Sequence, residues 1–253
     1  MDFKVFGHQK RPTLLLIPGL GVSYEIFHPL IHLLEPHFYI VAAQVDGFTL
    51  GQYTQFTSID DQATQIINYI SREHNGNIHC AYGLSLGGKI LSRVLECNQI
   101  NIQHAIFDAA PLLPLPRWLV KPLSYFQCIN VWTCYSWTSF WKWLFASHYF
   151  DILLDECKKV YPFGGSKAVI AGYHSVYTNK LCSLSHPNIH YWYGTREAFI
   201  ARLQAKHLLT LCPNTHVEVF NNMNHGQLLI DHPEKIARRI TRIAEGLHLD
   251  IRK

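Results

Sequence analysis

The sequence predicts an α/β fold, with a mostly parallel central sheet flanked by helices and a helical cap inserted into it. Short β-prone apolar runs alternate with segments of helical periodicity over most of the 253 residues, which favours parallel strands joined by helices. Between residues 109 and 185 this alternation stops, and that segment holds five of the six tryptophans. We therefore expect one domain over residues 1–253, with a cap or lid over residues 109–185.

The first part of the chain alternates as this fold class requires. Thr13–Ile17 is a continuous apolar run, typical of a strand that is covered on both faces. Residues 24–34 carry apolar side chains at helical spacing, and residues 38–43 form the next apolar run. Ser58 is followed by acidic residues, so it predicts the start of a helix that extends to about residue 71.

A G-L-S-L-G motif at residues 83–87 lies between a predicted strand at 77–82 and a predicted helix at 86–97. This context is typical of a nucleophile elbow, a tight turn that presents one hydroxyl above a sheet. Ser85 is the central residue, and Gly83 and Gly87 lack side chains that would collide in so tight a turn. We expect Ser85 to be a nucleophile.

The alternation continues on both sides of the cap. We expect strands at residues 103–107, 189–193 and 216–220, and helices at residues 198–211 and 234–246.

A serine hydroxyl needs a neighbouring base, and His225 is the best candidate among sixteen histidines. It follows a predicted strand, precedes a glycine and comes after the serine in the chain, as the order serine, acid, histidine requires. His28 and His32 share a helix face, but no H-E-x-x-H or similar pattern accompanies them, so we expect no metal site.

The acid that orients this histidine should follow a strand between the serine and the histidine. Glu197 fits this position best, although an acid there could also merely offset a helix dipole. Asp108, after the strand that follows the elbow, and Asp231, close to His225 in the sequence, remain alternatives. Each would fix the imidazole tautomer and stabilise its charged form.

An oxyanion hole requires two backbone donors. The N–H of Leu86, directly after the nucleophile, is one candidate. The turn Pro18-Gly19-Leu20-Gly21 after the first predicted parallel strand supplies the second, and we assign it to the N–H of Leu20.

The cap segment allows several interpretations. It is either a helical insertion packed on the sheet or a lid whose aromatic inner face lines an acyl or aryl pocket, and both can hold. We expect Trp137, Trp141 and Leu84 to contact the substrate. Residues 122–141 are uncharged but contain polar residues throughout, so we expect no transmembrane helix. A surface that rests on a membrane is a weaker alternative, because basic residues are few.

Taken together, these motifs resemble the α/β-hydrolase superfamily, particularly its compact bacterial members with a helical cap. The matching segments are L-L-L-I-P-G-L-G, D-G-F, Y-G-L-S-L-G-G, Y-G-T-R-E and N-H-G-Q-L-L-I-D-H-P-E. The resemblance implies a serine hydrolase with the triad Ser85, Glu197 and His225. Two features depart from the common pattern: Pro18 stands where histidine is more frequent, and the acid is glutamate where aspartate is commoner.

The composition bears on the kinds of partner and on the cellular compartment that we expect. The net charge of +4 is spread along the chain without a long run of like charges, which argues against nucleic-acid binding. Seven scattered cysteines without a C-x-x-C pattern, and no signal-peptide pattern, favour a cytoplasmic location.

We therefore expect a hydrolase of carboxylic esters with an apolar acyl or aryl part of short to medium length, acting through an acyl-enzyme and needing no cofactor. Its partner would be a small-molecule acyl substrate. An acyltransferase or thioesterase with the same triad, or a ligand-binding protein that kept only the fold, are the alternatives.

Overall fold

The computed structural model describes residues 1–184 and 188–246, and it confirms the predicted fold class. Seven strands form one sheet in the order β1-β3-β2-β4-β5-β6-β7, and every neighbouring pair is parallel except β1 with β3. The strands are β1 (Asp2–Phe6), β2 (Thr13–Ile17), β3 (Tyr39–Gln44), β4 (Asn77–Leu84), β5 (Asn101–Asp108), β6 (Ile189–Gly194) and β7 (His216–Phe220).

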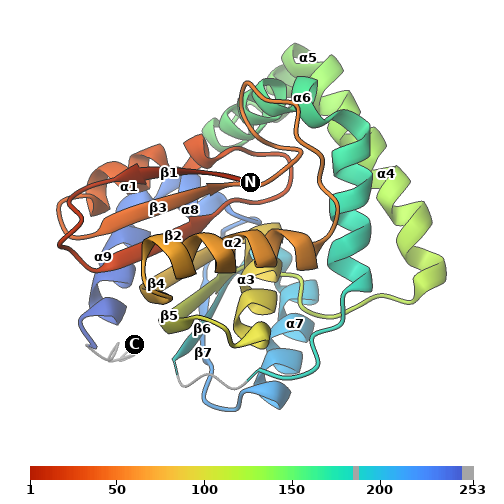
Figure 1. Ribbon diagram of the computed structural model, residues 1–253. Helices are drawn as coiled ribbons and strands as arrows, with labels where there is room; N and C mark the ends of the chain where they lie inside the picture. Colours follow the sequence, from red (N-terminus) through yellow and green to blue (C-terminus); the bar gives the residue numbers. More distant parts are fainter. Residues whose placement is uncertain (185–187, 247–253) are drawn as a thin grey trace.

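Helices cover both faces of this sheet (Figure 1). One face packs against α2 (Ile59–Glu73), α3 (Leu86–Cys97) and α7 (Ala198–Leu211), and the other against α1 (His28–Leu34), α8 (Gln227–Asp231) and α9 (Pro233–Ala244). Two 3-10 turns, η1 (Tyr24–Phe27) and η2 (Thr195–Glu197), lie in the loops of this region. We call the seven strands, these six helices and the two turns the sheet portion.

The apolar side chains of strand β2 show how two helical layers cover the sheet. Successive side chains of a strand point to opposite faces. Leu14 and Leu16 belong to the core cluster beneath α1 and α9, whereas Leu15 and Ile17 belong to the cluster beneath α2 and α3. All four are fully buried, so the continuous apolar run predicts the doubly covered strand correctly.

The parallel register brings the carboxyl ends of the central strands to one edge of the sheet. Leu84 at the end of β4 pairs with Asp108 at the end of β5, and Gly194 at the end of β6 pairs with Phe220 at the end of β7. Ligand sites of open parallel sheets lie outside the carboxyl ends of their strands. The loops after these strands are therefore the place to look for a site.

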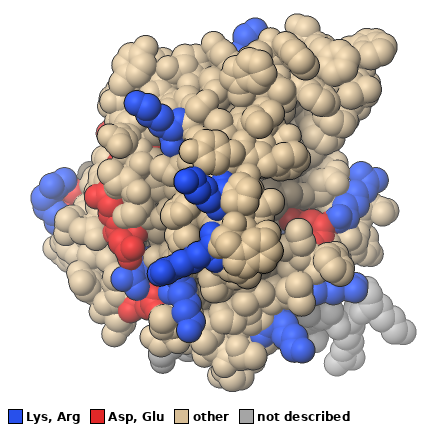
Figure 2. All heavy atoms as spheres, turned by 90° about the vertical axis from the view of Figure 1, so that its right-hand side faces the viewer, with Lys and Arg blue, Asp and Glu red and all other residues tan. Residues whose placement is uncertain are grey.

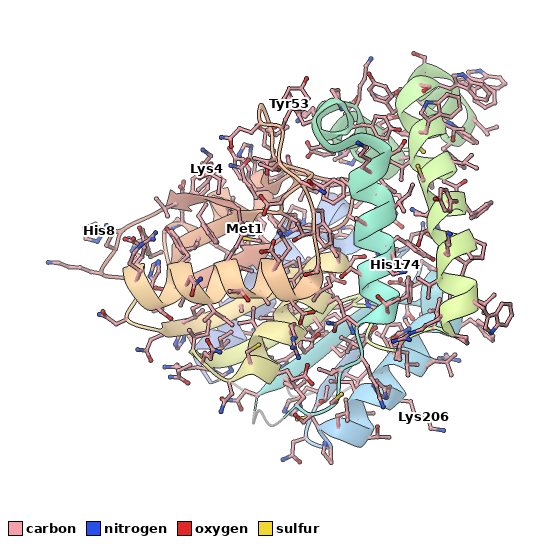
Figure 3. The ribbon with its side chains drawn as sticks, turned by 45° about the vertical axis from the view of Figure 1, so that its right-hand side comes forward. Met1, Lys4, His8, Tyr53, His174 and Lys206 are labelled. Carbon is pink, nitrogen blue, oxygen red and sulfur yellow. The ribbon has the colours of Figure 1, made fainter. Side chains whose placement is uncertain are left out.

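The cap consists of α4 (Arg117–Ser136), α5 (Thr138–Phe145) and α6 (His148–Thr178), inserted between β5 and β6. Helix α6 is interrupted at Gly165, where φ is +57° and ψ is −155°. Helix α4 packs mainly on α6 and lies beside its second half, which carries His174 (Figure 3). The expected cap segment ends at Ser185, which lies outside the described residues.

Helix α6 is attached to the sheet portion by the contacts of Lys159 with Glu25 and of His148 with Asp231, and by four further contacts. The Ser23 hydroxyl donates to the buried carboxylate of Glu156 at 2.7 Å, and the backbone N–H of Ile59 donates to the Ser175 hydroxyl at 2.8 Å. The Tyr149 hydroxyl donates to the backbone carbonyl of His225 at 2.6 Å. The fourth attachment is a backbone contact, because a Cβ atom added to Gly164 would lie 1.7 Å from the carbonyl oxygen of Gly47.

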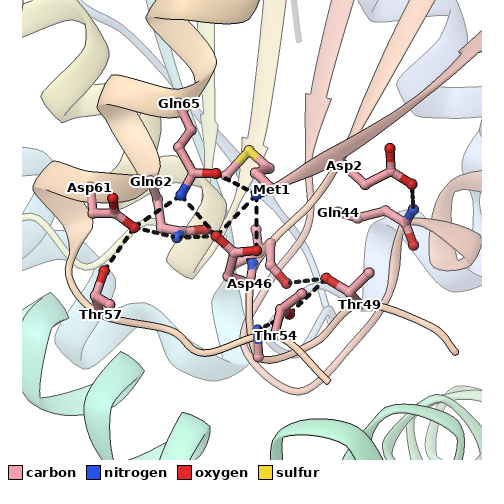
Figure 4. A network of polar contacts seen from close by, with 12 residues as sticks. Met1, Asp2, Gln44, Asp46, Thr49, Thr54, Thr57, Asp61, Gln62 and Gln65 are labelled. Atoms are coloured by element: carbon pink, nitrogen blue, oxygen red, sulfur yellow. Dashed lines mark hydrogen bonds and ion pairs between the residues drawn. The ribbon is translucent and has the colours of Figure 1, made fainter. Parts of the chain in front are cut away.

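The loop that receives Gly164 is itself held by a polar network around Asp46 (Figure 4). The carboxylate of Asp46 accepts hydrogen bonds from the side-chain amides of Gln62 at 2.9 Å and Gln65 at 2.8 Å. The backbone N–H of Asp46 donates to the side-chain oxygen of Gln62 at 3.0 Å. The amino group of Met1 lies 3.0 Å from the same carboxylate. The network ties the end of β3 to α2.

Two elements of the sheet portion were not predicted. Strand β1 lies antiparallel at the sheet edge, and α8 follows the histidine loop. The expected helix over residues 24–34 is divided into η1 and α1. Among the described residues, no helix combines the length and the apolar character needed to cross a bilayer.

Candidate active site

Ser85 lies in the turn between β4 and α3, in a backbone conformation that residues other than glycine rarely adopt. Its φ is +50° and its ψ is −111°. A Cβ atom added to Gly83 would lie 2.6 Å from the backbone of Gly87, and one added to Gly88 would lie 2.5 Å from the Cβ of Ala110. Such separations are too short for real atoms, so these glycines allow the turn to close and present Ser85 at the sheet edge.

The turn after β2 lies directly beside this elbow. A Cβ atom added to Gly87 would lie 2.1 Å from the carbonyl oxygen of Ile17, and one added to Gly19 would lie 3.6 Å from the Cβ of Ser85. Leu20 and Leu86 line the same cavity as Ser85. Leu86 is the first residue of α3, and the first N–H groups of a helix have no partner within it. Both proposed oxyanion donors are thus next to the serine.

His225 is held by Glu197. The Nδ1 atom of His225 lies 2.7 Å from a carboxylate oxygen of Glu197, and the other oxygen of that carboxylate accepts the N–H of Gly194 at 3.2 Å. The loops after β6 and β7 are also joined to each other. The N–H of Asn222 donates to the Thr195 hydroxyl at 2.8 Å. The relative position of acid and histidine is therefore fixed by backbone contacts.

The electrostatic surroundings of His225 favour its charged form. Burial lowers the pKa of His225, but the hydrogen bond and the charge of Glu197, with a further contribution from Asp108, outweigh it and raise the pKa above its ordinary value. Half of the side chain remains exposed, at 50%. A base of this kind can accept a proton from a nearby hydroxyl and remain beside solvent and substrate.

The other two acid candidates have different partners. Asp108 is buried at the end of β5 and accepts a hydrogen bond from the Tyr82 hydroxyl. Burial raises the pKa of Asp108 to about 6. Asp231 lies at the end of α8, where it contacts the Nδ1 atom of His148 at 3.1 Å and the side chain of Gln227 at 2.8 Å. Glu197 is the carboxylate hydrogen-bonded to His225.

A cavity of about 430 Å³ opens onto the serine and the histidine. Its wall is mainly apolar and aromatic, with few polar groups, as is usual for sites that bind small organic molecules. Besides the residues already named, the lining includes Ala109, Pro111, Gln127, Tyr173, Val176, Tyr177, Tyr191, Arg196, Phe199, Ile200, Ala201 and Gln204.

The residues expected to contact substrate from the cap are not part of this wall. Trp137 and Trp141 are absent from the lining, because α5 and the turn before it lie at the far end of the cap (Figure 1). Leu84 is also absent, although its side chain lies beside Gly226.

The second half of α6 supplies cap residues that the sequence interpretation missed. Tyr173 and Tyr177 stand one helical turn apart there, and that spacing is the only signal that could have indicated them.

Residues that could hold a metal ion do not gather near this site. Within the described ranges, no group of three or more histidine, cysteine, aspartate or glutamate side chains is arranged to bind one. The chemistry available at the cavity is that of a hydroxyl, an imidazole, a carboxylate and backbone N–H groups.

Comparison by sequence finds no matching family model and no matching curated protein. Comparison of structures finds many matches. An alpha/beta hydrolase family protein from Desulfitobacterium hafniense is 16% identical, with a TM-score of 0.77 over 96% of this chain and 99% of that chain. A carboxylesterase structure from the ammonia-oxidizing thaumarchaeon Nitrososphaera gargenis is 15% identical, with a TM-score of 0.77 over 97% of this chain and 94% of that chain.

Two further matches show how widely chemistry varies on this fold. A thermophilic esterase from Thermogutta terrifontis is 15% identical, with a TM-score of 0.75 over 98% of this chain and 94% of that chain. The epoxide hydrolase CorEH is 14% identical, with a TM-score of 0.71 over 97% and 95%. At such identities the likeness establishes architecture and not activity. The strand order, the flanking helices, the helical insertion after β5 and these matches together identify the chain as a protein with the α/β-hydrolase fold.

Proposed function

We propose that this protein is a serine hydrolase that cleaves carboxylic esters with an apolar acyl or aryl part, through the triad Ser85, His225 and Glu197. The observation that carries the proposal is the 2.7 Å contact between His225 and Glu197 beside a cavity that Ser85 and His225 both line. The aromatic wall of the cavity favours an apolar substrate.

In this mechanism the Ser85 hydroxyl attacks the ester carbonyl while His225 accepts its proton. Glu197 holds the imidazole tautomer and stabilises the imidazolium. The N–H groups of Leu86 and Leu20 bind the negatively charged oxygen of the tetrahedral intermediate. His225 then returns the proton to the departing alcohol, and water releases the acid from the acyl-enzyme by the same steps. No metal ion or organic cofactor takes part.

A serine nucleophile argues against epoxide-hydrolase chemistry for this chain, since in the superfamily that the chain resembles that chemistry uses aspartate at the elbow. The acyl-enzyme would also be common to thioester hydrolysis and to acyl transfer. Product analysis with competing water, alcohol and amine acceptors separates these outcomes.

Active-site labelling tests the nucleophile directly. A fluorophosphonate probe should label the wild-type protein and leave Ser85→Ala unlabelled, and mass spectrometry should locate the adduct on the peptide that contains Ser85. Ser92→Ala is the matched control, since that serine is buried in α3 and bonds to the Lys89 carbonyl at 2.7 Å. Equal labelling of wild type and Ser85→Ala would refute the proposal.

A chain-length series of p-nitrophenyl esters then defines the acyl group. We expect turnover of short and medium chains by the wild type and none above background by Ser85→Ala. Circular dichroism of both proteins establishes that the fold is retained.

A further inference from the structure

Helix α4 has its large apolar side chains on the outside. Val120, Ser124 and Cys128 are buried at successive turns and face α6. The outward positions carry mainly aromatic side chains, and the most exposed of these are Trp118 at 76% and Phe126 at 62%. An ordinary surface helix has the opposite arrangement, with its polar residues toward water. The outer side of α4 is thus an apolar face that no part of the described chain, residues 1–184 and 188–246, covers.

This face extends over the neighbouring helices. Of the 18 large hydrophobic side chains that are exposed among the described residues, 14 belong to α4, α5, the turn between them and α7. Single exposed apolar residues are normal on proteins, whereas a contiguous group of this size marks an interaction surface. We define the aromatic face as Trp118, Tyr125, Phe126, Ile129, Trp132, Trp137, Phe140, Trp143, Leu144 and Phe145.

Helices α4 and α7 both contribute residues to the serine cavity. Gln127 of α4 lines that cavity, and so do Phe199 and Ile200 at the start of α7. Phe199 is 86% exposed and Ile200 is 60% exposed, so both are cavity residues and surface residues at once. Helices α4 and α7 lie on the same side of the molecule (Figures 1 and 3). A surface that covered α4 would reach the mouth of the cavity.

The charges on and beside this face are basic. The sequence contains no aspartate or glutamate between Ala109 and Phe150, and the upper part of the surface in Figure 2, over the cap, is mostly uncharged with a few basic residues. Arg117 and Lys121 stand at the start of α4, and Lys167 shares an open cleft with Arg117. Among the described residues, these three cations take part in no salt bridge.

We propose that the aromatic face binds the surface of an anionic lipid bilayer, and that the ester substrate enters the Ser85 cavity from that surface. Tryptophan and tyrosine rings are favoured at lipid–water interfaces because one end is apolar and the other can hydrogen-bond. A helix with an apolar face and basic neighbours lies in the plane of the interface without crossing it. The entry of substrate from the lipid rests on the proposed function, whereas the binding itself does not.

A second copy of this chain is a less suitable partner for the same face. A symmetric contact would place the same patch on both subunits. Arg117 and Lys121 of both subunits would then lie at one interface, to which residues 109–150 of neither subunit contribute an acidic partner, and like charges brought together at an interface oppose association. Anionic headgroups complement these charges instead.

Vesicle binding tests the proposal without depending on catalysis. Full-length Ser85→Ala protein is sedimented with vesicles of phosphatidylcholine alone or of phosphatidylcholine with 30% phosphatidylglycerol. We expect binding to the anionic vesicles, and at least about tenfold weaker binding to the neutral ones. Adding Trp118→Ser, Phe126→Ser and Ile129→Ser should weaken anionic binding by about tenfold or more.

Two further variants separate the contributions. Val5→Ser with Leu33→Ser is the matched control, because both side chains are exposed apolar residues on β1 and α1, away from the cap. This control should bind as the parent does. Arg117→Gln with Lys121→Gln should weaken binding to anionic vesicles and leave binding to neutral vesicles unchanged.

Several results would overturn the proposal. These are the absence of binding to either vesicle, undiminished binding of the folded triple variant, or a dimer in solution that the triple variant converts to a monomer. Activity of the serine enzyme is a separate readout. When the same three substitutions are made in the protein that retains Ser85, hydrolysis of a vesicle-borne ester should fall while hydrolysis of a water-soluble ester is unchanged. Vesicle binding together with a failure of fluorophosphonate to label the wild-type protein would refute the proposed function and leave the proposed binding surface intact.

Discussion

Strand β2 and helix α4 both carry large apolar side chains, but they direct them to opposite environments. The four leucine and isoleucine residues from Leu14 to Ile17 are fully buried between two helical layers. On α4, Trp118 and Ile129 project away from the protein, and the buried positions hold smaller residues such as Ser124. The large apolar side chains of β2 are buried by other parts of the chain, whereas those on the outer side of α4 are exposed.

The two regions also differ in how they take part in the candidate chemistry. Ser85, Glu197 and His225 all lie at strand ends of the sheet portion, in loops that backbone contacts fix to one another. The cap contributes wall residues from α4 and α6, and one hydrogen bond from Tyr149 to the His225 loop. In the proposed mechanism, the sheet portion therefore supplies the reacting groups and the cap supplies part of the cavity wall.

The largest expected effect is on the acid of the triad. Glu197→Gln should reduce kcat/KM for a water-soluble ester by about 10³- to 10⁴-fold, since the amide no longer stabilises the imidazolium. Asp231→Asn should have little effect, because Asp231 contacts His148 and Gln227. Steady-state kinetics of both variants checks this. A larger loss in Asp231→Asn than in Glu197→Gln would assign the acid differently.

Stability measurements should separate the buried strand from the exposed helix. Leu16→Ala removes a fully buried side chain and should lower the free energy of unfolding by about 3 kcal/mol. Ile129→Ala removes a side chain that is 57% exposed, and the free energy should change by less than about 0.5 kcal/mol. Urea denaturation of both variants measures the difference. A comparable cost at the two positions would mean that α4 is covered in solution.

A smaller effect is expected where the cap meets the histidine loop. Tyr149→Phe removes the hydrogen bond to the His225 carbonyl and should reduce kcat/KM by about fivefold, the equivalent of one hydrogen bond of roughly 1 kcal/mol. Tyr161→Phe is the control, since its hydroxyl contacts only Ser166 on the exposed side of α6. Equal rates for wild type and Tyr149→Phe would show that the loop keeps its position without this contact.

The last expectation concerns pH. Catalysis needs neutral His225, so kcat/KM should rise with pH through the pKa of His225, which Glu197 raises above its ordinary value. Glu197→Gln removes that influence and should move the midpoint to lower pH. The ion pair stabilises the fold fully below the pKa of an unfolded histidine, and this contribution is lost as pH rises through the folded pKa. A pH–rate profile that does not move in Glu197→Gln would contradict this assignment.

The sequence predicted those elements whose local residue pattern is strong and agrees with the topology of the fold. The parallel alternation and the run Thr13–Ile17 predicted the sheet, and the motif around Ser85 predicted the elbow turn. Strand β1 was missed because Asp2–Phe6 is a short edge strand with half-exposed side chains and little apolar pattern. The brief helix α8 was missed for a similar reason, since five residues give almost no periodicity.

The cap was harder to predict because helical spacing shows which residues share a face, but not which way that face points. Trp137 and Trp141 share helical spacing, and the lid interpretation assigned them to the inside. In the structure the cavity wall comes instead from Tyr173 and Tyr177 on α6 and from Phe199 on α7. Which residues line the cavity depends on the interruption at Gly165, because the interruption determines where the second half of α6 lies. The run P-F-G-G at residues 162–165 is a local signal for a break in the helix, but it does not show where the second half is directed.

The attachments of α6 to the sheet portion have a consequence for engineering. Glu156, Gly164 and Ser175 connect this helix to the sheet portion, whereas α4 and α5 contact mainly α6. Residues 117–145 can therefore be exchanged for another helical hairpin as a graft, provided that α6 is kept. A library of such chimaeras would vary the entrance to the cavity while the serine, the histidine and the glutamate remain in register.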